Sequence, residues 1–164
     1  MTYNLEVVAK YLPFLLLGVG ITIRFTVLSF LLGAVIGLAI ALGRISGNRM
    51  LRLPCVWYVD FFRGTPLLAQ VYLIHFGLPQ VLGYRPAGPI DALVALTLNC
   101  AAYVAEIWRA GIESIERGQM EAARSLGMTY AQSMRFVILP QAFKRAIPPL
   151  GNEFIALLKE SSLV

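Results

Sequence analysis

Long apolar runs separated by shorter polar segments dominate the pattern of this chain. Residues 25–43 form an uncharged run of nineteen residues. An α-helix rises about 1.5 Å per residue, so about 20 apolar residues cross the roughly 30 Å hydrocarbon core of a bilayer. The pattern therefore predicts an all-helical membrane protein with about four membrane-spanning helices, at about residues 20–43, 53–77, 90–109 and 148–164.

The segments that flank these spans are expected to lie outside the hydrocarbon. Residues 1–19 are amphipathic, and we expect them to lie along the outer interface before the first span. Glycine and proline recur in residues 77–90, which predicts a loop on the outer side. Pro148 and Pro149 suit the first turn of a helix, so we expect the fourth span to begin there.

Composition and charge support a membrane protein. The chain is 58% hydrophobic and only 14% charged, whereas soluble domains average about 25% charged residues. The net charge is +5, and most basic residues fall in residues 44–52 and 109–147, which the positive-inside rule assigns to the cytoplasm. No basic face interleaved with aromatic residues is present, so nucleic-acid binding is not expected. Cys55 and Cys100 lie in apolar runs, which indicates ordinary buried thiols.

Polar residues interrupt the second predicted span. Asp60 and Arg63 are three residues apart, so they share a helical face and can pair. Pro66 removes a backbone donor and drives Thr65 away from helical geometry, which predicts a break near the bilayer midplane. Two interpretations of the break remain open. Either it lines a cavity, or it is a proline kink in a packing helix.

Small and charged residues in the first and third predicted spans indicate close helix packing. Gly33, Gly37 and Ala41 recur every four residues. Such a stripe lets another helix approach closely, either from within the chain or from another chain. Glu106 and Arg109 fall near the inner end of the third span, where we expect a structural ion pair.

Three polar residues inside the spans are candidates for a substrate path, namely Thr65, Asn99 and Glu153. The side-chain amide of Asn99 can both donate and accept hydrogen bonds. A carboxylate within a membrane is costly and marks a transport pathway by default, so Glu153 is a candidate partner for a substrate ammonium or guanidinium. Pairing of Glu153 with Arg63 or Lys159, as a structural contact, is the alternative.

A polar, charged segment lies between the third and fourth spans. Glu121 stands early in a short helix, where a negative charge suits the positive helix end, and Gly127 fits the left-handed position that ends it. Thr129 and Gln132 match a capping box for a second helix, which we expect to stop near Pro140. A docking surface for a separate subunit is one interpretation of these two helices, and a generic cytoplasmic loop is the other.

The same segment carries a spaced motif. Its residues follow the pattern E-A-A-x-x-x-G, nine residues, then I-x-L-P, with Val137 in place of isoleucine. This pattern resembles the signature of membrane permease subunits of bacterial ABC importers. Residues 62–70 (F-R-G-T-P-L-L-A-Q) and 102–112 (A-Y-V-A-E-I-W-R-A-G-I) resemble segments of the polar amino-acid permease family within that group.

The resemblance covers nearly the whole chain and implies a type I ABC importer transmembrane domain. Residues 1–164 would form one partial domain, with about four of an expected five spans and cytoplasmic coupling helices at about residues 113–145. The absence of the fifth span indicates a fragment or a truncated gene. The resemblance assigns contact with the ATPase subunits to six residues, Glu121, Ala122, Ala123, Gly127, Leu139 and Pro140.

The resemblance also implies partners and a location. It implies ABC ATP-binding subunits, a second permease subunit that is identical or paralogous, an extracytoplasmic amino-acid-binding protein and a place in the bacterial inner membrane. The chain has no G-x-x-x-x-G-K-[S/T] phosphate loop, so ATP and Mg²⁺ are expected in the partner subunit and no cofactor in this chain.

Two other functional classes compete with this interpretation. An ion-driven carrier or channel fits the spans equally well, but it leaves the docking motif unexplained. An intramembrane hydrolase needs a nucleophile and a base within reach of each other. His75 is the single histidine of the sequence and no G-x-S-x-G elbow is present, so this class is not favoured.

Overall fold

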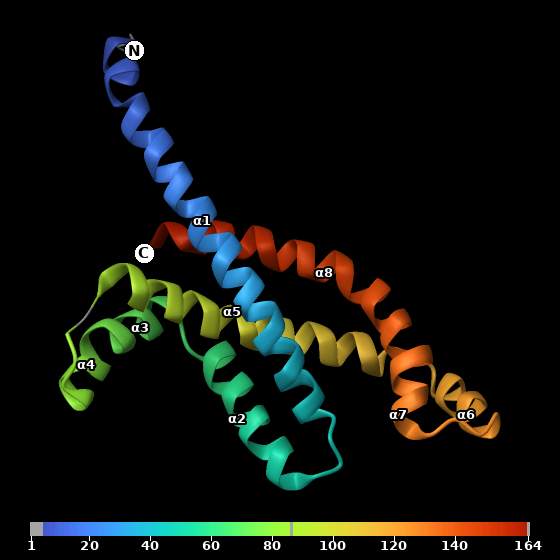
Figure 1. The fold of residues 1–164 in the computed structure, drawn as a ribbon. Helices are drawn as coiled ribbons and strands as arrows, with labels where there is room; N and C mark the ends of the chain where they lie inside the picture. The colour runs from blue at the N-terminus through green and yellow to red at the C-terminus, as the bar shows by residue number, and fades with distance from the viewer. Residues whose placement is uncertain (1–4, 86, 164) are drawn as a thin grey trace.

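The computed structural model describes residues 5–85 and 87–163, and all regular structure in these ranges is helical, which confirms the all-helical class (Figure 1). The elements are α1 (Leu5–Arg44), α2 (Arg49–Gly64), α3 (Leu67–Tyr72), the π-helix η1 (Leu73–Gly77), α4 (Leu78–Leu82), α5 (Gly88–Glu113), α6 (Arg117–Ser125), α7 (Tyr130–Ser133), the π-helix η2 (Met134–Ile138), α8 (Leu139–Glu160) and the 3₁₀-helix η3 (Ser161–Leu163).

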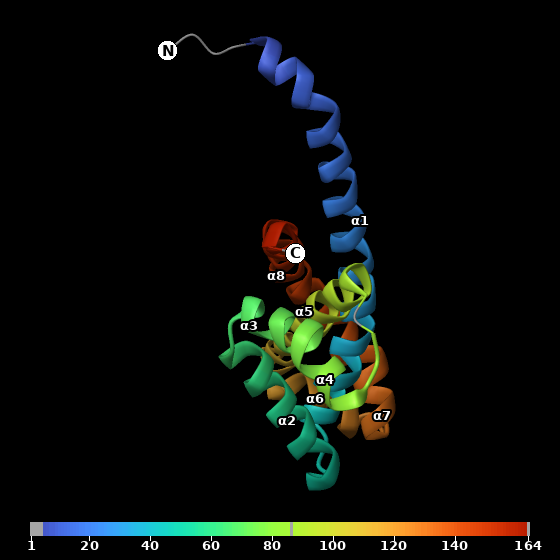
Figure 2. The same ribbon diagram turned by 90° about the vertical axis from the view of Figure 1, so that its left-hand side faces the viewer.

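The centre of the bundle is α5, on which α1, α2, α3 and α8 all pack (Figures 1 and 2). Its side chains Leu96 and Val104 are fully buried, together with Val59 of α2 and Leu157 of α8. Within residues 5–85 and 87–163, two helices are long and apolar enough to cross a membrane, Val7–Arg44 and Gly88–Glu113. The spans expected at residues 20–43 and 90–109 are therefore each contained in one continuous helix.

The first helix is longer than expected. Residues 5–19 do not form a separate interfacial segment but continue directly into the span, so that α1 extends well beyond the rest of the bundle (Figure 2). Pro13 lies inside this helix. Residues 14–23 are mostly apolar and contain no turn signal, so the helix is not interrupted there. Pro13 removes only one backbone hydrogen bond, close to the N-terminal end of α1.

The small-residue stripe of α1 packs against α5 within the chain. A Cβ atom added to Gly33 would lie 2.9 Å from Cys100 Sγ, and one added to Gly37 would lie 2.7 Å from the carbonyl oxygen of Ala101. Ala41, one turn further on, is fully buried. The stripe is therefore a seam between two helices of this chain, with glycine required at the closest approach.

The second predicted span is two helices rather than one. Thr65 has extended backbone angles (φ −117°, ψ 145°), and the chain changes direction there between α2 and α3, as expected from Pro66 (Figure 1). The prediction of a loop over residues 77–90 was wrong in extent. The helix continues through Pro79 to Leu82, and the next helix begins at Gly88. Pro79 follows shortly after η1 in this helical run, and the carbonyl oxygen of Ile74 accepts a hydrogen bond from the hydroxyl of Tyr84 instead, at 3.2 Å.

The N-terminal end of α5 is joined to the preceding helix by a polar contact. His75 Nδ1 of η1 lies 2.8 Å from Asp91 Oδ2 of α5. Asp91 also accepts a hydrogen bond from the backbone N–H of Ala87, at 3.0 Å. His75 thus has a structural partner near the short connection between α4 and α5, where Gly83 takes a left-handed conformation (φ 71°).

The C-terminal half is one continuous helical run from Tyr130 to Glu160 through α7, η2 and α8. The expected stop near Pro140 and the expected start at Pro148 and Pro149 are both wrong. Pro140 falls in the first turn of α8, directly after a π-helix in which the N–H of Leu139 bonds to the residue five positions back. Pro148 and Pro149 lie inside α8. Proline is tolerated inside membrane helices because neighbouring groups satisfy the backbone carbonyls that it leaves without a donor.

The seam between α1 and α5 yields a prediction about stability. Gly37→Ala places a methyl group against backbone of α5, and we expect it to destabilise the protein by about 1–3 kcal/mol, as overpacking does. Gly18→Ala is the matched control on the same helix, since no neighbouring atom lies within 4 Å of a Cβ added there. Thermal unfolding of the purified protein measures both. An unchanged melting temperature for Gly37→Ala would contradict the seam.

Candidate functional site

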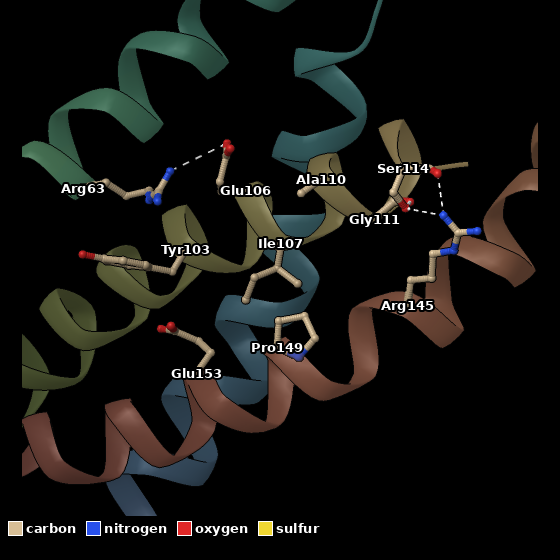
Figure 3. A pocket seen from close by; sticks show the side chains of 10 residues that line it. All are labelled: Arg63, Tyr103, Glu106, Ile107, Ala110, Gly111, Ser114, Arg145, Pro149 and Glu153. Carbon is tan, nitrogen blue, oxygen red and sulfur yellow. Dashed lines mark hydrogen bonds and ion pairs between the residues drawn. The ribbon is translucent and has the colours of Figure 1, made fainter. Parts of the chain in front are cut away.

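The main candidate site is a cavity of about 420 Å³ between α2, α5 and α8 (Figure 3). Its lining combines two basic groups, two carboxylates and one phenol with apolar walls. The lining residues are Arg63 from α2, Tyr103, Glu106, Ile107, Ala110 and Gly111 from α5, Ser114 at the end of α5, and Arg145, Pro149 and Glu153 from α8.

Arg63 enters the cavity from the last turn of α2. Its guanidinium carbon lies 5.2 Å from the centre of the Tyr103 ring, within the range of a cation–π contact. Its Nη1 is 3.8 Å from Glu106 Oε2. The pair that the sequence suggested between Asp60 and Arg63 is not formed, because Arg63 turns toward α5 instead.

Glu106 is the centre of an ion network on the α5 wall of the cavity. Its carboxylate pairs with Arg44 at the end of α1 and with Arg109 on its own helix, and Arg109 also pairs with Glu113. The side chains of Arg44 and Glu106 are only 13% and 22% exposed. The expected pair of Glu106 and Arg109 is present, and Arg44 extends it to the first helix.

The three residues predicted for the substrate path lie in two places. Glu153 lines the cavity and is half-buried. In the described part of the chain, no ion pair within 4.0 Å joins it to Arg63 or Lys159. Thr65 and Asn99 lie instead at the break between α2 and α3.

At that break the side chains form a hydrogen-bonded cluster. Asn99 is only 3% exposed, and its Nδ2 donates to Oε1 of Gln70 at 3.0 Å. Gln70 Nε2 in turn lies 2.9 Å from Thr65 Oγ1. The sequence analysis missed Gln70, although a lone amide four residues after Pro66 in an apolar helix is a usable signal.

The polar segment after α5 has much of the predicted geometry. Gly127 has a left-handed conformation (φ 83°) at the end of α6. Thr129 and Gln132 form the predicted capping box. Leu126, beside Gly127, is 84% exposed.

The six motif residues differ in their exposure. Ala123 is buried against the rest of the chain, and Leu139 is partly buried. The other four residues, Glu121, Ala122, Gly127 and Pro140, are exposed.

The polar segment is joined to the cavity through packed helices. Ile112 and Ile115 near the end of α5 pack with Met134 and Ile138 of η2 in one apolar cluster. Arg145 of α8 donates to the backbone carbonyl and the hydroxyl of Ser114, and both residues line the cavity (Figure 3). Met120 of α6 packs against the same cluster, so α6 is joined through it to α5 and η2.

The sequence matches a known protein family over most of its length. The family model is that of the binding-protein-dependent transport system inner membrane component, and it covers residues 33–164. The chain belongs to this family. It is a membrane-embedded permease subunit of an ABC transporter, and ATP hydrolysis lies in a separate subunit, as expected.

Similar curated proteins are amino-acid permeases. The arginine transport system permease protein ArtQ of Bacillus subtilis is 44% identical over 168 residues, which cover 100% of this chain and 75% of ArtQ. The putative glutamine transport system permease protein GlnP of Rickettsia bellii is 40% identical, covering 97% of this chain and 74% of GlnP. The expected assignment to amino-acid ABC permeases is confirmed.

Solved ABC transporters have the same fold. A crystal structure of an amino acid ABC transporter with histidines superposes with a TM-score of 0.92 at 46% identity, covering 99% of this chain and 76% of that chain. An inward-facing MetNI methionine ABC transporter superposes with a TM-score of 0.79 at 27% identity, covering 94% and 74%. The type I importer fold is confirmed, and the comparisons favour ATP-driven import over an ion-driven carrier.

The ion network of this ABC permease yields a second prediction. Glu106→Gln leaves Arg44, Arg63 and Arg109 close together without their shared counter-charge. We expect a loss of about 1–3 kcal/mol of stability, below the cost for a fully buried pair because Glu106 is partly exposed. The control is Glu113→Gln, which removes only the exposed partner of Arg109 and is expected to cost under about 1 kcal/mol. Unfolding in mixed SDS micelles compares the two, and equal effects would contradict the network.

Proposed function

We propose that this permease imports a cationic or polar amino acid through the cavity between α2, α5 and α8. The observation that carries the proposal is the charge on the cavity walls, which Arg63 and Glu153 enter from different sides (Figure 3). An amino acid carries an ammonium and a carboxylate, so a wall with both signs of charge is complementary to it. The relative ArtQ, described as an arginine transport permease, supports a cationic substrate.

The path is proposed to continue from the cavity past the helix break, where Thr65 and Asn99 lie. Arg63 supports this direction, because it lines the cavity and stands only two residues before Thr65. Irregular backbone inside a membrane is tolerated where it is buried in protein or lines a cavity. Thr65, Asn99 and Glu153 would then contact the substrate in succession.

The proposed assembly has three kinds of partner. Two ATP-binding subunits, which hold ATP and Mg²⁺, would dock on the cytoplasmic side. A second permease subunit, identical or paralogous, would complete the pore, and an extracytoplasmic binding protein would deliver the amino acid. The family description names both binding-protein dependence and the inner membrane, which supports this assembly in a bacterial inner membrane.

The docking surface is proposed to be the bend between α6 and α7. Exposed Glu121, Ala122 and Gly127 would contact the ATP-binding subunit, while Leu139 and Pro140 connect the bend to α8. Ala123 is proposed to act from the buried side of α6, where it sets how closely α6 packs. Closure of the ATP-binding subunits would then move α6 and, through its packing, the helices around the cavity.

The substrate assignment is tested by Glu153→Gln in the assembled importer. Loss of one charge-assisted contact is expected to raise the KM for arginine transport about tenfold or more, since such contacts contribute about 1.5–3 kcal/mol. Glu160→Gln, on the same helix but outside the cavity lining, is the matched control. Uptake of radiolabelled arginine into proteoliposomes measures both. An unchanged KM for Glu153→Gln would remove this residue from the site.

The coupling assignment is tested by Gly127→Arg. A bulky side chain at the exposed bend, in a conformation that favours glycine, is expected to abolish co-purification of the ATP-binding subunits. Gly47→Arg is the control, because its position is also open and lies in the loop between α1 and α2. Affinity purification followed by transport assays gives the result. If Gly127→Arg retains both the subunits and transport, the docking surface lies elsewhere.

A further inference from the structure

The break between α2 and α3 creates a hydrogen-bonding problem. In a continuous helix the N–H of residue 66 would bond to the carbonyl oxygen of Phe62, four residues back, but Pro66 has no N–H. The carbonyl oxygen of Phe61 accepts from the hydroxyl of Thr65, and among the described residues no bond joins it to the N–H of Thr65. Carbonyl groups left without donors in a membrane-embedded chain are costly, so they need other partners.

Side chains supply the missing donors. Gln70 Nε2 lies 2.8 Å from the carbonyl oxygen of Phe62 and 3.0 Å from that of Thr65. Thr65 Oγ1 donates to the carbonyl oxygen of Phe61 at 2.8 Å. The amide of Gln70, which is 3% exposed, therefore takes over the bond that Pro66 cannot make and joins the end of α2 to the start of α3.

The same amide joins both helices to α5. Asn99 Nδ2 donates to Gln70 Oε1 at 3.0 Å and lies 3.5 Å from the carbonyl oxygen of Phe62. Tyr103 follows Asn99 by one helical turn and carries the ring over which Arg63 stacks. Two successive turns of α5 thus hold the last turn of α2, first through the backbone of Phe62 and then through the side chain of Arg63.

We propose that Gln70 is a positioning residue, whose amide fixes the angle between α2 and α3 and thereby holds Arg63 in the cavity. Gln70 does not line the cavity, so it acts on the substrate only through Arg63. The effect on transport rests on the proposed function of the cavity, whereas the effect on the angle does not. The two are measured separately.

The angle is measured in the permease assembled with its ATP-binding subunits. Spin labels replace Trp57 on α2 and Val81 on α4, which are 76% and 81% exposed. Cys55 and Cys100 are first replaced by alanine, and the labelled permease is diluted with unlabelled subunit so that distances within one chain dominate. Pulsed electron resonance gives the distance distribution across the break.

Two variants and one matched control are compared. Gln70→Leu removes the whole amide, and Gln70→Glu keeps the size and the acceptor for Asn99 but removes the Nε2 donors. Gln80→Leu makes the same exchange at an exposed position of the same helical run. Both Gln70 variants are expected to broaden the distribution and to raise the KM for arginine severalfold, while Gln80→Leu leaves both unchanged.

The proposal is overturned if both Gln70 variants keep the wild-type distance distribution. A lower melting temperature with that distribution unchanged also overturns it, because Gln70 would then serve stability alone. A broadened distribution with an unchanged KM would support the fixed angle but reject its role in holding Arg63. The substrate assignment is tested by a different variant: an unchanged KM for arginine in Glu153→Gln would reject that assignment without bearing on the angle between α2 and α3.

Discussion

Backbone carbonyls that lose their helical donors are the constraint on which this structure depends. In a membrane every such group needs a partner from the protein, and each proline in a helix removes one. At the α2–α3 break the amide of Gln70 reaches the carbonyl of Phe62. Continuing the π-helical pattern of η1, the N–H absent from Pro79 would have met the carbonyl of Ile74, and the hydroxyl of Tyr84 donates to that oxygen at 3.2 Å. At both places a side chain replaces the bond that proline removes.

The packing of α1 on α5 follows a related rule. Lipid is as apolar as leucine, so helices associate in a membrane through close contact and polar links rather than through burial of apolar area alone. Gly33 and Gly37 allow the contact, and Ala41 completes it. One turn later Arg44 meets Glu106, so the seam ends in an ion pair that fixes the axial position of α1. The helix α5, which lines the cavity, is therefore packed closely against α1 on another side.

Features that depend on residues within one helical turn were predicted correctly from the sequence. Features that depend on a contact with a distant residue or a neighbouring helix were not. The left-handed Gly127, the capping box at Thr129 and the break at Pro66 all follow from residues within one turn, and all are present. The stop near Pro140 and the start at Pro148 were wrong, because a proline is a weak boundary when a π-helix or neighbouring helices compensate it. The contact between Arg44 and Glu106 joins residues 62 positions apart, so no local pattern reveals it.

The placement of the polar links suggests how force reaches the cavity. Arg145 of α8 holds Ser114 at the end of α5, next to the cluster in which Ile115 packs on η2. Met120 of α6 packs on the same cluster, so α6 is joined to α5 through η2. Arg63 of α2 is held on α5 by the ring of Tyr103. Because α2 is held on α5, the proposed coupling would change the separation of Arg63 and Glu153 through movement of α8 relative to these two helices. Under the proposed function, that separation would set how well a zwitterion is bound, so mechanical coupling and substrate affinity would share one coordinate.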